Sequence, residues 1–226
     1  MGLNKNTPRF LGIAFLVQFV GSLLSGTLSG LILETGTISE KLVNISNNTT
    51  LFRLCIFLDL ITSIAIIAMA VLLYIVLQKQ NKILALVALS WWLTEAIILA
   101  ISRIWALGLL ELSLDYVQTG VTDPSYFLTL GSVMYESIQF GFALHMLFFT
   151  VGGPLWYYMF YKSEAIPRGL ALWGLVLFPL MAISITLDIL GVTLDDTLKL
   201  IIFVPYIPFE AVMGIWFLVK GIKDYD

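Results

Sequence analysis

The stretch "LFRLCIFLDLITSIAIIAMAVLLYIVL", residues 51–77, carries only two charged side chains, Arg53 and Asp59. A helix needs about 20 residues to cross the roughly 30 Å of hydrocarbon in a bilayer. The stretch also lacks the alternation of polar and apolar residues that is typical of a membrane-spanning strand. It therefore predicts a transmembrane helix.

The composition extends this prediction to the whole chain. Of its 226 residues, 59% are hydrophobic and only 12% are charged, which is too little charge to cover the surface of a soluble domain. We predict an all-α, polytopic membrane protein, a single domain built as a bundle of six transmembrane helices in the lipid bilayer. The predicted spans lie at about 10–33, 51–77, 83–110, 134–161, 168–191 and 198–219.

The distribution of lysine and arginine predicts the orientation. Eight of these residues lie near one side of the membrane, at the N-terminus, the C-terminus and the second and fourth connections, whereas three lie near the other side. Cytoplasmic segments carry the excess of positive charge. We therefore expect a multi-pass protein of the cell (plasma) membrane with both termini in the cytoplasm.

Charge and composition argue against several classes of function. The net charge of −3 gives no reason to expect nucleic acid as a partner, and the chain has only one cysteine, Cys55, and one histidine, His145. We expect no metal site and no cofactor, because a catalytic zinc ion normally takes about three protein ligands. The sequence also lacks G-x-S-x-G, H-E-x-x-H and phosphate-binding glycine loops, which argues against an enzyme without excluding one.

Polar side chains within the apolar spans are the candidate functional residues. Glu210, about 13 Å from the cytoplasmic end of its span, lies near the middle of the bilayer, at the level of Gln18. A carboxylate at this depth costs about 2.5–3.5 kcal/mol on insertion scales, so such groups face the bundle interior. The sequence predicts a polar cavity that opens outward and is closed toward the cytoplasm. The candidate residues for binding a ligand or an ion are Glu95, Glu210, Gln18, His145, Asp59, Arg103 and Asp188.

Helical phase leaves two questions open within this set. Arg103 is expected to pair with Asp59, Asp188 or Glu95 and so to tie helices together. Glu136 and His145 are nine residues apart, about 180° around a helix, so they cannot face the same narrow cavity. Either Glu136 is interfacial or His145 packs elsewhere.

Proline and small residues predict local geometry in the first and last spans. Pro205 and Pro208 should kink the last helix and leave the carbonyls near Ile201 and Val204 without donors, free to join the site. In the first span, small residues are spaced for close packing against another helix. They include Gly12, Gly21, Ser22, Gly26 and Gly30.

Two connections on the outer side are longer than the others. Residues 34–50 form the first. The second, residues 111–133, contains Asp123, which is placed to cap a helix that starts at Pro124. The fourth span should therefore project above the membrane.

Four segments resemble a prokaryotic membrane family known as domain of unknown function 4386. They are "LFRLCIFLDLITSIAIIAMAVLLYIVL" (51–77), "NKILALVALSWWLTEAIILA" (81–100), "KSEAIPRGLALWGL" (162–175) and "FEAVMGIWFLVKG" (209–221). The resemblance covers nearly the whole chain and implies a six-helix fold, with Asp59, Glu95 and Glu210 at motif positions. The third span departs from the family pattern, since it has Trp91 and Trp92 where an arginine is usual.

Three functions remain open at this point. The first is a protein that binds or transports a small ligand, cation or proton through the outward-facing cavity. The second is a structural, sensory or assembly subunit without a substrate, whose polar residues hold helices together. The third and least favoured is an intramembrane enzyme that acts on a lipid or isoprenoid. The oligomeric state is not predicted.

Overall fold

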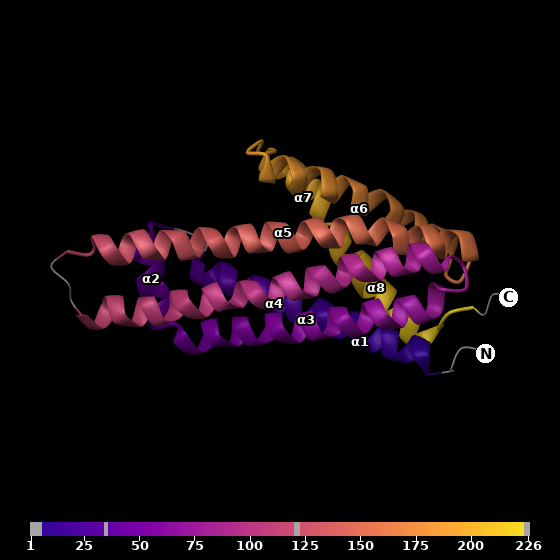
Figure 1. Cartoon of the computed structure of the whole chain (residues 1–226), viewed down its shortest axis with the longest axis horizontal. Coiled ribbons are helices and arrows are strands. Elements are labelled where there is room, and N and C mark those ends of the chain that lie inside the picture. Colours follow the sequence, from indigo (N-terminus) through magenta and orange to yellow (C-terminus); the bar gives the residue numbers. More distant parts are fainter. Residues whose placement is uncertain (1–5, 34–35, 120–122, 224–226) are drawn as a thin grey trace.

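A computed structural model describes residues 6–33, 36–119 and 123–223, and all of the regular elements in these ranges are helices (Figure 1). The predicted all-helical fold is therefore confirmed. The helices are α1 (Thr7–Leu33), α2 (Ile38–Asn47), α3 (Thr49–Leu77), α4 (Lys82–Thr119), α5 (Ser125–Ser163), α6 (Arg168–Ile189), α7 (Asp196–Phe203) and α8 (Tyr206–Val219).

Six segments are long and apolar enough to cross a membrane. Five of them are the single helices α1, α3, α4, α5 and α6, and the sixth runs from Asp196 to Val219. This last segment is divided into α7 and α8 at residues 204–205, where the predicted kink falls. Pro205 ends the hydrogen-bond ladder there because it has no backbone N–H to donate.

The helices pack in sequence order around one bundle. α1 packs against α3, α3 against α4, α4 against α5 and α5 against α6, while α8 returns to pack against α1. The beginning of α1 and the end of α8 consequently lie at the same end of the bundle, here called the terminal end (Figure 1). The opposite end, where α2 lies, is called the α2 end. The side of the membrane that each end faces remains a prediction.

α4 and α5 extend farther than the predicted spans at the α2 end (Figure 1). With 38 and 39 residues, each is about 57 Å long, nearly twice the thickness of the hydrocarbon layer. The fifth helix begins at Ser125, one residue later than predicted, and the Ser125 N–H donates to Asp123 Oδ1 at 3.0 Å. Because α4 projects as far as α5, the projection is a helical hairpin and not one helix.

A short helix, α2, occupies most of the first connection. Its start is fixed by a capping box, in which the Thr37 N–H donates to Glu40 Oε2 at 2.6 Å and the Glu40 N–H donates to Thr37 Oγ1 at 3.4 Å. The hydrogen bonds from Thr37 hold the pKa of Glu40 below its ordinary value. Lys41 of α2 is buried, and its ammonium group donates to the Leu33 carbonyl. α2 thus covers the α2 end of the bundle, packed against α4 and α5.

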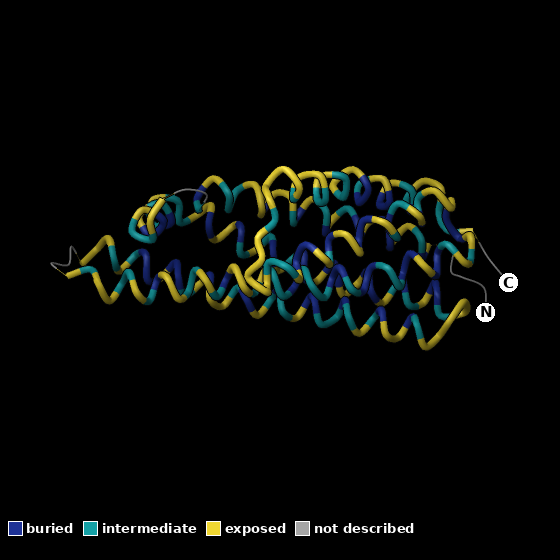
Figure 2. The backbone as a smooth tube through the Cα atoms, turned by 90° about the horizontal axis from the view of Figure 1, so that it is seen from above, coloured by how far each residue is buried: buried dark blue, intermediate teal, exposed yellow. Residues whose placement is uncertain are grey.

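Buried apolar side chains form two separate clusters. The larger one lies in the terminal half and contains a stack of aromatic rings that includes Trp92, Trp156 and Phe178. The smaller one joins α2 to α3, α4 and α5 around Leu42, Ile45 and Leu109. Buried positions recur on the facing sides of the helices and exposed positions cover the outward sides (Figure 2). The polar residues described below lie between the two clusters.

Glycines allow helices to approach closely in the terminal half. A Cβ atom built on Gly153 of α5 would lie 2.1 Å from the Phe178 ring of α6, and one on Gly174 would lie 2.5 Å from the Tyr157 ring. Gly12 of α1 meets Leu218 of α8 in the same way, at 2.7 Å. Close approach of backbones is the usual role of small residues between membrane helices.

The prediction of close packing is wrong for two glycines in the second half of α1. A Cβ atom on Gly26 or on Gly30 would have no heavy atom of a neighbouring helix within 4 Å. Spacing along the sequence does not distinguish these glycines from Gly12, which meets α8, or from Gly21, which meets Thr62 of α3. α8 reaches only the first half of α1, so the second half has no partner on that side.

The contact at Gly153 makes a prediction about stability. Gly153→Ala should lower the free energy of unfolding by about 1–3 kcal/mol, because the added methyl group must displace the buried Phe178 ring. Gly169→Ala is the matched control, since Gly169 of α6 has open space at its Cβ position and alanine has the higher helix propensity. Reversible unfolding in mixed micelles measures both values, and an equal loss in the two variants would contradict this packing.

Candidate functional site

One pocket, with a volume of about 260 Å³, lies between the two apolar clusters. It is lined by residues of α1, α3, α4, α5 and α8. Six of the seven residues that the sequence predicts for the site line it together. They are Gln18, Asp59, Glu95, Arg103, His145 and Glu210.

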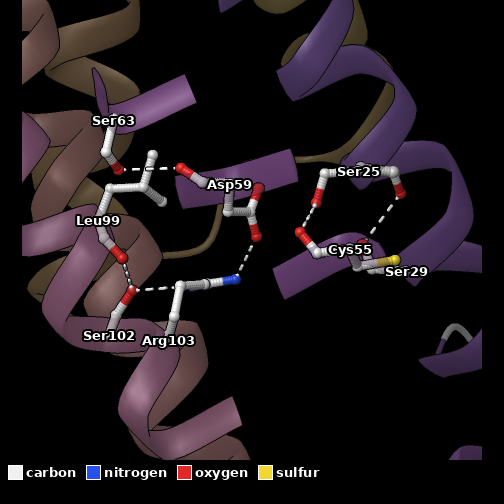
Figure 3. A network of polar contacts seen from close by, with 9 residues as sticks. Ser25, Ser29, Cys55, Asp59, Ser63, Leu99, Ser102 and Arg103 are labelled. Carbon is white, nitrogen blue, oxygen red and sulfur yellow. Dashed lines mark hydrogen bonds and ion pairs between the residues drawn. The ribbon is translucent and has the colours of Figure 1, made fainter. Parts of the chain in front are cut away.

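An ion pair between α3 and α4 lies at the side of the pocket nearer the α2 end. Arg103 Nη1 donates to Asp59 Oδ2 at 2.6 Å, and only 13% and 12% of the two side chains are exposed. Two further donors of Arg103 point to the Ser102 hydroxyl, at 3.2 and 2.9 Å (Figure 3). Each of the two charges therefore has a counter-charge. Of the three acidic partners that the sequence allowed for Arg103, the structure shows Asp59.

Glu95 and Glu210 carry no comparable partner. Glu95 is 1% exposed and Glu210 is 3% exposed, and both line the same pocket. Glu95 Oε1 lies 3.6 Å from His145 Nδ1, which is too long for a hydrogen bond. Gln18 and Tyr206 lie beside Glu210. One oxygen of each glutamate, Glu95 Oε2 and Glu210 Oε1, has no hydrogen-bond partner in the described structure.

Polar atoms without partners concentrate in this pocket. Across residues 6–33, 36–119 and 123–223, seven buried side-chain nitrogen or oxygen atoms lack a hydrogen bond, and five of the seven belong to residues that line the pocket. Those five are Gln18 Oε1, Thr62 Oγ1, Glu95 Oε2, His145 Nδ1 and Glu210 Oε1. Buried polar groups normally have partners, so this concentration indicates a place for water or a ligand.

The break before α8 brings Glu210 into the pocket. α8 begins at Tyr206, so Tyr206 and Glu210 are separated by one turn and point to the same side. The Tyr206 ring packs against Phe149 and Phe178, with centroids 5.4 and 5.7 Å apart. Sequence reasoning missed Tyr206, although its spacing of four residues from Glu210 was the signal that could have found it.

The expectation that freed carbonyl groups join the site is wrong. The Val204 carbonyl accepts a hydrogen bond from the Ile207 N–H at 3.1 Å, and neither Ile201 nor Val204 lines the pocket. The chain continues almost at once into α8, and the donor that Pro208 cannot supply to the Val204 carbonyl is replaced by Ile207. The polar lining of the pocket comes mainly from side chains.

Asp188 lies outside the pocket, unlike the other six predicted residues. It forms an ion pair of 2.9 Å with Lys199, and 29% of its side chain is exposed. This pair links the end of α6 to α7. Depth along the helix alone had placed Asp188 near the site, whereas the tilt of α6 away from the bundle separates them (Figure 1).

The question about α5 is resolved by the direction of its two side chains. His145 lines the pocket, whereas Glu136 is exposed and lines a groove on the outer side of α4 and α5. The histidine also contacts the Phe142 ring, at 5.4 Å between centroids. Of the two alternatives, the one with Glu136 on the outside holds.

Among the described residues, no three side chains of His, Cys, Asp or Glu lie close enough together to hold a metal ion. Glu95 and Glu210 line one open space together with the rings of Phe142, Phe149 and Tyr206. Such a space can accept a donor-rich or positively charged group.

The buried ion pair predicts a large effect of a single substitution. Arg103→Met should lower the free energy of unfolding by about 3 kcal/mol or more, because it leaves the Asp59 carboxyl buried without its counter-charge. Asp59→Asn combined with Arg103→Met should recover part of this loss. Unfolding in mixed micelles measures each variant.

The control for that experiment is the exposed pair of Arg53 and Glu111. Its side chains are 55% and 58% exposed, at a separation of 3.0 Å, so Arg53→Met should cost less than about 1 kcal/mol. Similar losses for Arg53→Met and Arg103→Met would show that burial of the inner pair carries no special weight.

A protein family model matches nearly the whole chain. The model of a family described as "Domain of unknown function (DUF4386)" matches residues 10–221, a range that includes every residue of the pocket. Neither the curated proteins nor the solved structures gave a match. Because the match covers nearly the whole chain, this six-helix protein belongs to the family with domain of unknown function DUF4386.

Proposed function

We propose that this protein binds a small organic cation, an amine in its ammonium form, in the pocket between Glu95 and Glu210. The observation that carries the proposal is the pair of buried carboxyl groups, each with an unpartnered oxygen, on a cavity of about 260 Å³. An ammonium group has only donors, which is what unpartnered carboxyl oxygens require. The volume lies near the lower limit for ligand pockets, about 300 Å³, and so suits a small head group.

The charge balance of the pocket favours a cation over an anion. Arg103 donates hydrogen bonds to Asp59 and Ser102, and its positive charge is paired with the Asp59 carboxyl group. Glu95 and Glu210 remain, with His145 as the neighbouring titratable base. The rings of Phe142, Phe149 and Tyr206 line the same space and can stabilise a positive group through their faces.

Access differs between the two ends of the bundle. The larger apolar cluster, with its packed aromatic rings, separates the pocket from the terminal end. On the other side, a smaller cavity of about 100 Å³ shares Asp59, Arg103 and Phe142 with the pocket and continues toward the α2 end. With both termini in the cytoplasm, as we propose, the pocket extends from the middle of the membrane into its outer half.

Binding by the two glutamates is tested with ethylammonium chloride and the protein in lipid nanodiscs. Glu95→Gln and Glu210→Gln should each weaken binding at least about tenfold in calorimetry, since each removes a charged hydrogen-bond acceptor. Glu136→Gln, on the exposed side of α5, is the matched control and should bind as the wild type does. Sodium acetate should give no heat of binding.

Unchanged binding in both pocket variants would overturn the proposal. If ethylammonium does not bind at all and both variants are less stable than the wild type, the glutamates act as contacts between helices, as in a structural or assembly subunit. Ethylammonium binding that is lost in Glu95→Gln and Glu210→Gln, but kept in Glu136→Gln, would support a binding protein over a structural subunit.

The proposed orientation has its own test. In a Cys55→Ser background, Asn47→Cys places a thiol at an exposed position of α2 and Gln80→Cys places one in the exposed connection between α3 and α4. A membrane-impermeant maleimide added to intact cells should label the first and not the second, because we place the α2 end outside the cell in the plasma membrane. Labelling of Gln80→Cys alone would reverse the orientation.

A further inference from the structure

The side of the pocket between α1 and α5 is not closed by another helix. Within the described part of the chain, α1 packs against α3, α8 and α2, and α5 packs mainly against α4 and α6, but α1 and α5 do not contact each other. In the terminal half this side is filled by α8. Because α8 begins only at Tyr206, it does not extend along the second half of α1.

Two residues mark the edges of this opening. Gly26 of α1 lines the pocket and is exposed, and a Cβ atom there would meet nothing within 4 Å. Phe142 of α5 also lines the pocket and is 52% exposed. A residue that lines a pocket and is also exposed on the side of a membrane-spanning helix borders an opening toward the lipid.

The interior of the pocket supplies the independent sign of a ligand. Glu95 Oε2 and Glu210 Oε1 are buried, unpartnered and part of the same lining as Gly26. One pocket lining therefore joins two unsatisfied carboxyl groups with Met146, Phe142 and Gly26. The carboxyl groups are buried within the bundle, whereas Gly26 and Phe142 are exposed on its side.

We infer that the pocket opens sideways into the bilayer between α1 and α5, and that its ligand is a single-chain alkylamine. The ammonium group lies at Glu95 and Glu210, and the alkyl chain leaves through the opening beside Gly26 and Phe142 into the hydrocarbon. An amphiphile of this kind suits the pocket because each part of the molecule stays in a matching environment. If the ligand had no apolar chain, lipid chains would fill the opening. This inference rests on the proposed binding of an ammonium group.

The experiment compares octylammonium with ethylammonium, both measured by calorimetry on the protein in nanodiscs of one lipid. Gly26→Leu should weaken octylammonium binding about tenfold, because the added side chain occupies the path of the alkyl chain. Ethylammonium, which ends before the opening, should bind the variant within about twofold of the wild type. Retained ethylammonium binding also shows that the variant is folded.

Gly30→Leu is the matched control. Gly30 lies one turn farther along α1 and also has open space at its Cβ position, but it does not line the pocket. The same substitution there should leave the binding of both amines unchanged, and partitioning of octylammonium into the lipid is identical in the two samples. Ser22→Leu, one turn closer to Glu210 on the pocket face of α1, is the second variant and should also weaken octylammonium binding if Gly26→Leu does not fold.

The outcomes separate this inference from the proposed function. Equal octylammonium affinity in Gly26→Leu, Ser22→Leu and Gly30→Leu overturns the sideways opening, while ethylammonium binding that depends on Glu95 and Glu210 still supports the cation site. Loss of both amines in Gly26→Leu, with the fold intact by thermal unfolding, also overturns the opening, because the glycine would then belong to the head-group site. If neither amine binds the wild type, the inference and the proposed function fail together.

Discussion

The structure depends on how two carboxyl groups are accommodated in the middle of an apolar bundle. Glu95 and Glu210 come from helices that are far apart in the sequence, and both are almost completely buried. A charged group at this depth costs about 2.5–3.5 kcal/mol on insertion scales, so a buried carboxyl group is protonated, is paired, or faces water or a ligand. Asp59 shows the first solution through Arg103, whereas the two glutamates face a cavity.

The helices pack closely on one side of that cavity and leave the other side without a helix–helix contact. Glycines at the α1–α8 and α5–α6 contacts allow tight packing in the terminal half, and aromatic rings fill the space that remains. Near the middle of the bundle the proline break separates α7 from α8, so α8 covers only half of α1. The same break therefore positions Glu210 and leaves the α1–α5 side open.

The depth of each polar residue could be predicted from the sequence, because the helical rise fixes it once the spans are known. Depth alone was sufficient to identify six residues that line the pocket, among them Gln18, Glu95 and Glu210. Direction could not be predicted, because it depends on how each helix is rotated and tilted. Asp188 lies at the predicted depth on a helix that leans away from the pocket, and Gly26 has the spacing of a contact without a helix to contact.

The central claim is that the space between Glu95 and Glu210 receives a cation. Crystals of the protein grown with 2-bromoethylammonium test it most directly, because the anomalous signal of bromine locates the ligand without assumptions about its pose. The account predicts a bromine peak in the pocket, with the ammonium nitrogen within hydrogen-bonding distance of Glu95 and Glu210, about 2.7–3.2 Å. Direct contact of the two carboxyl groups across a closed space, without bromine there, would contradict it.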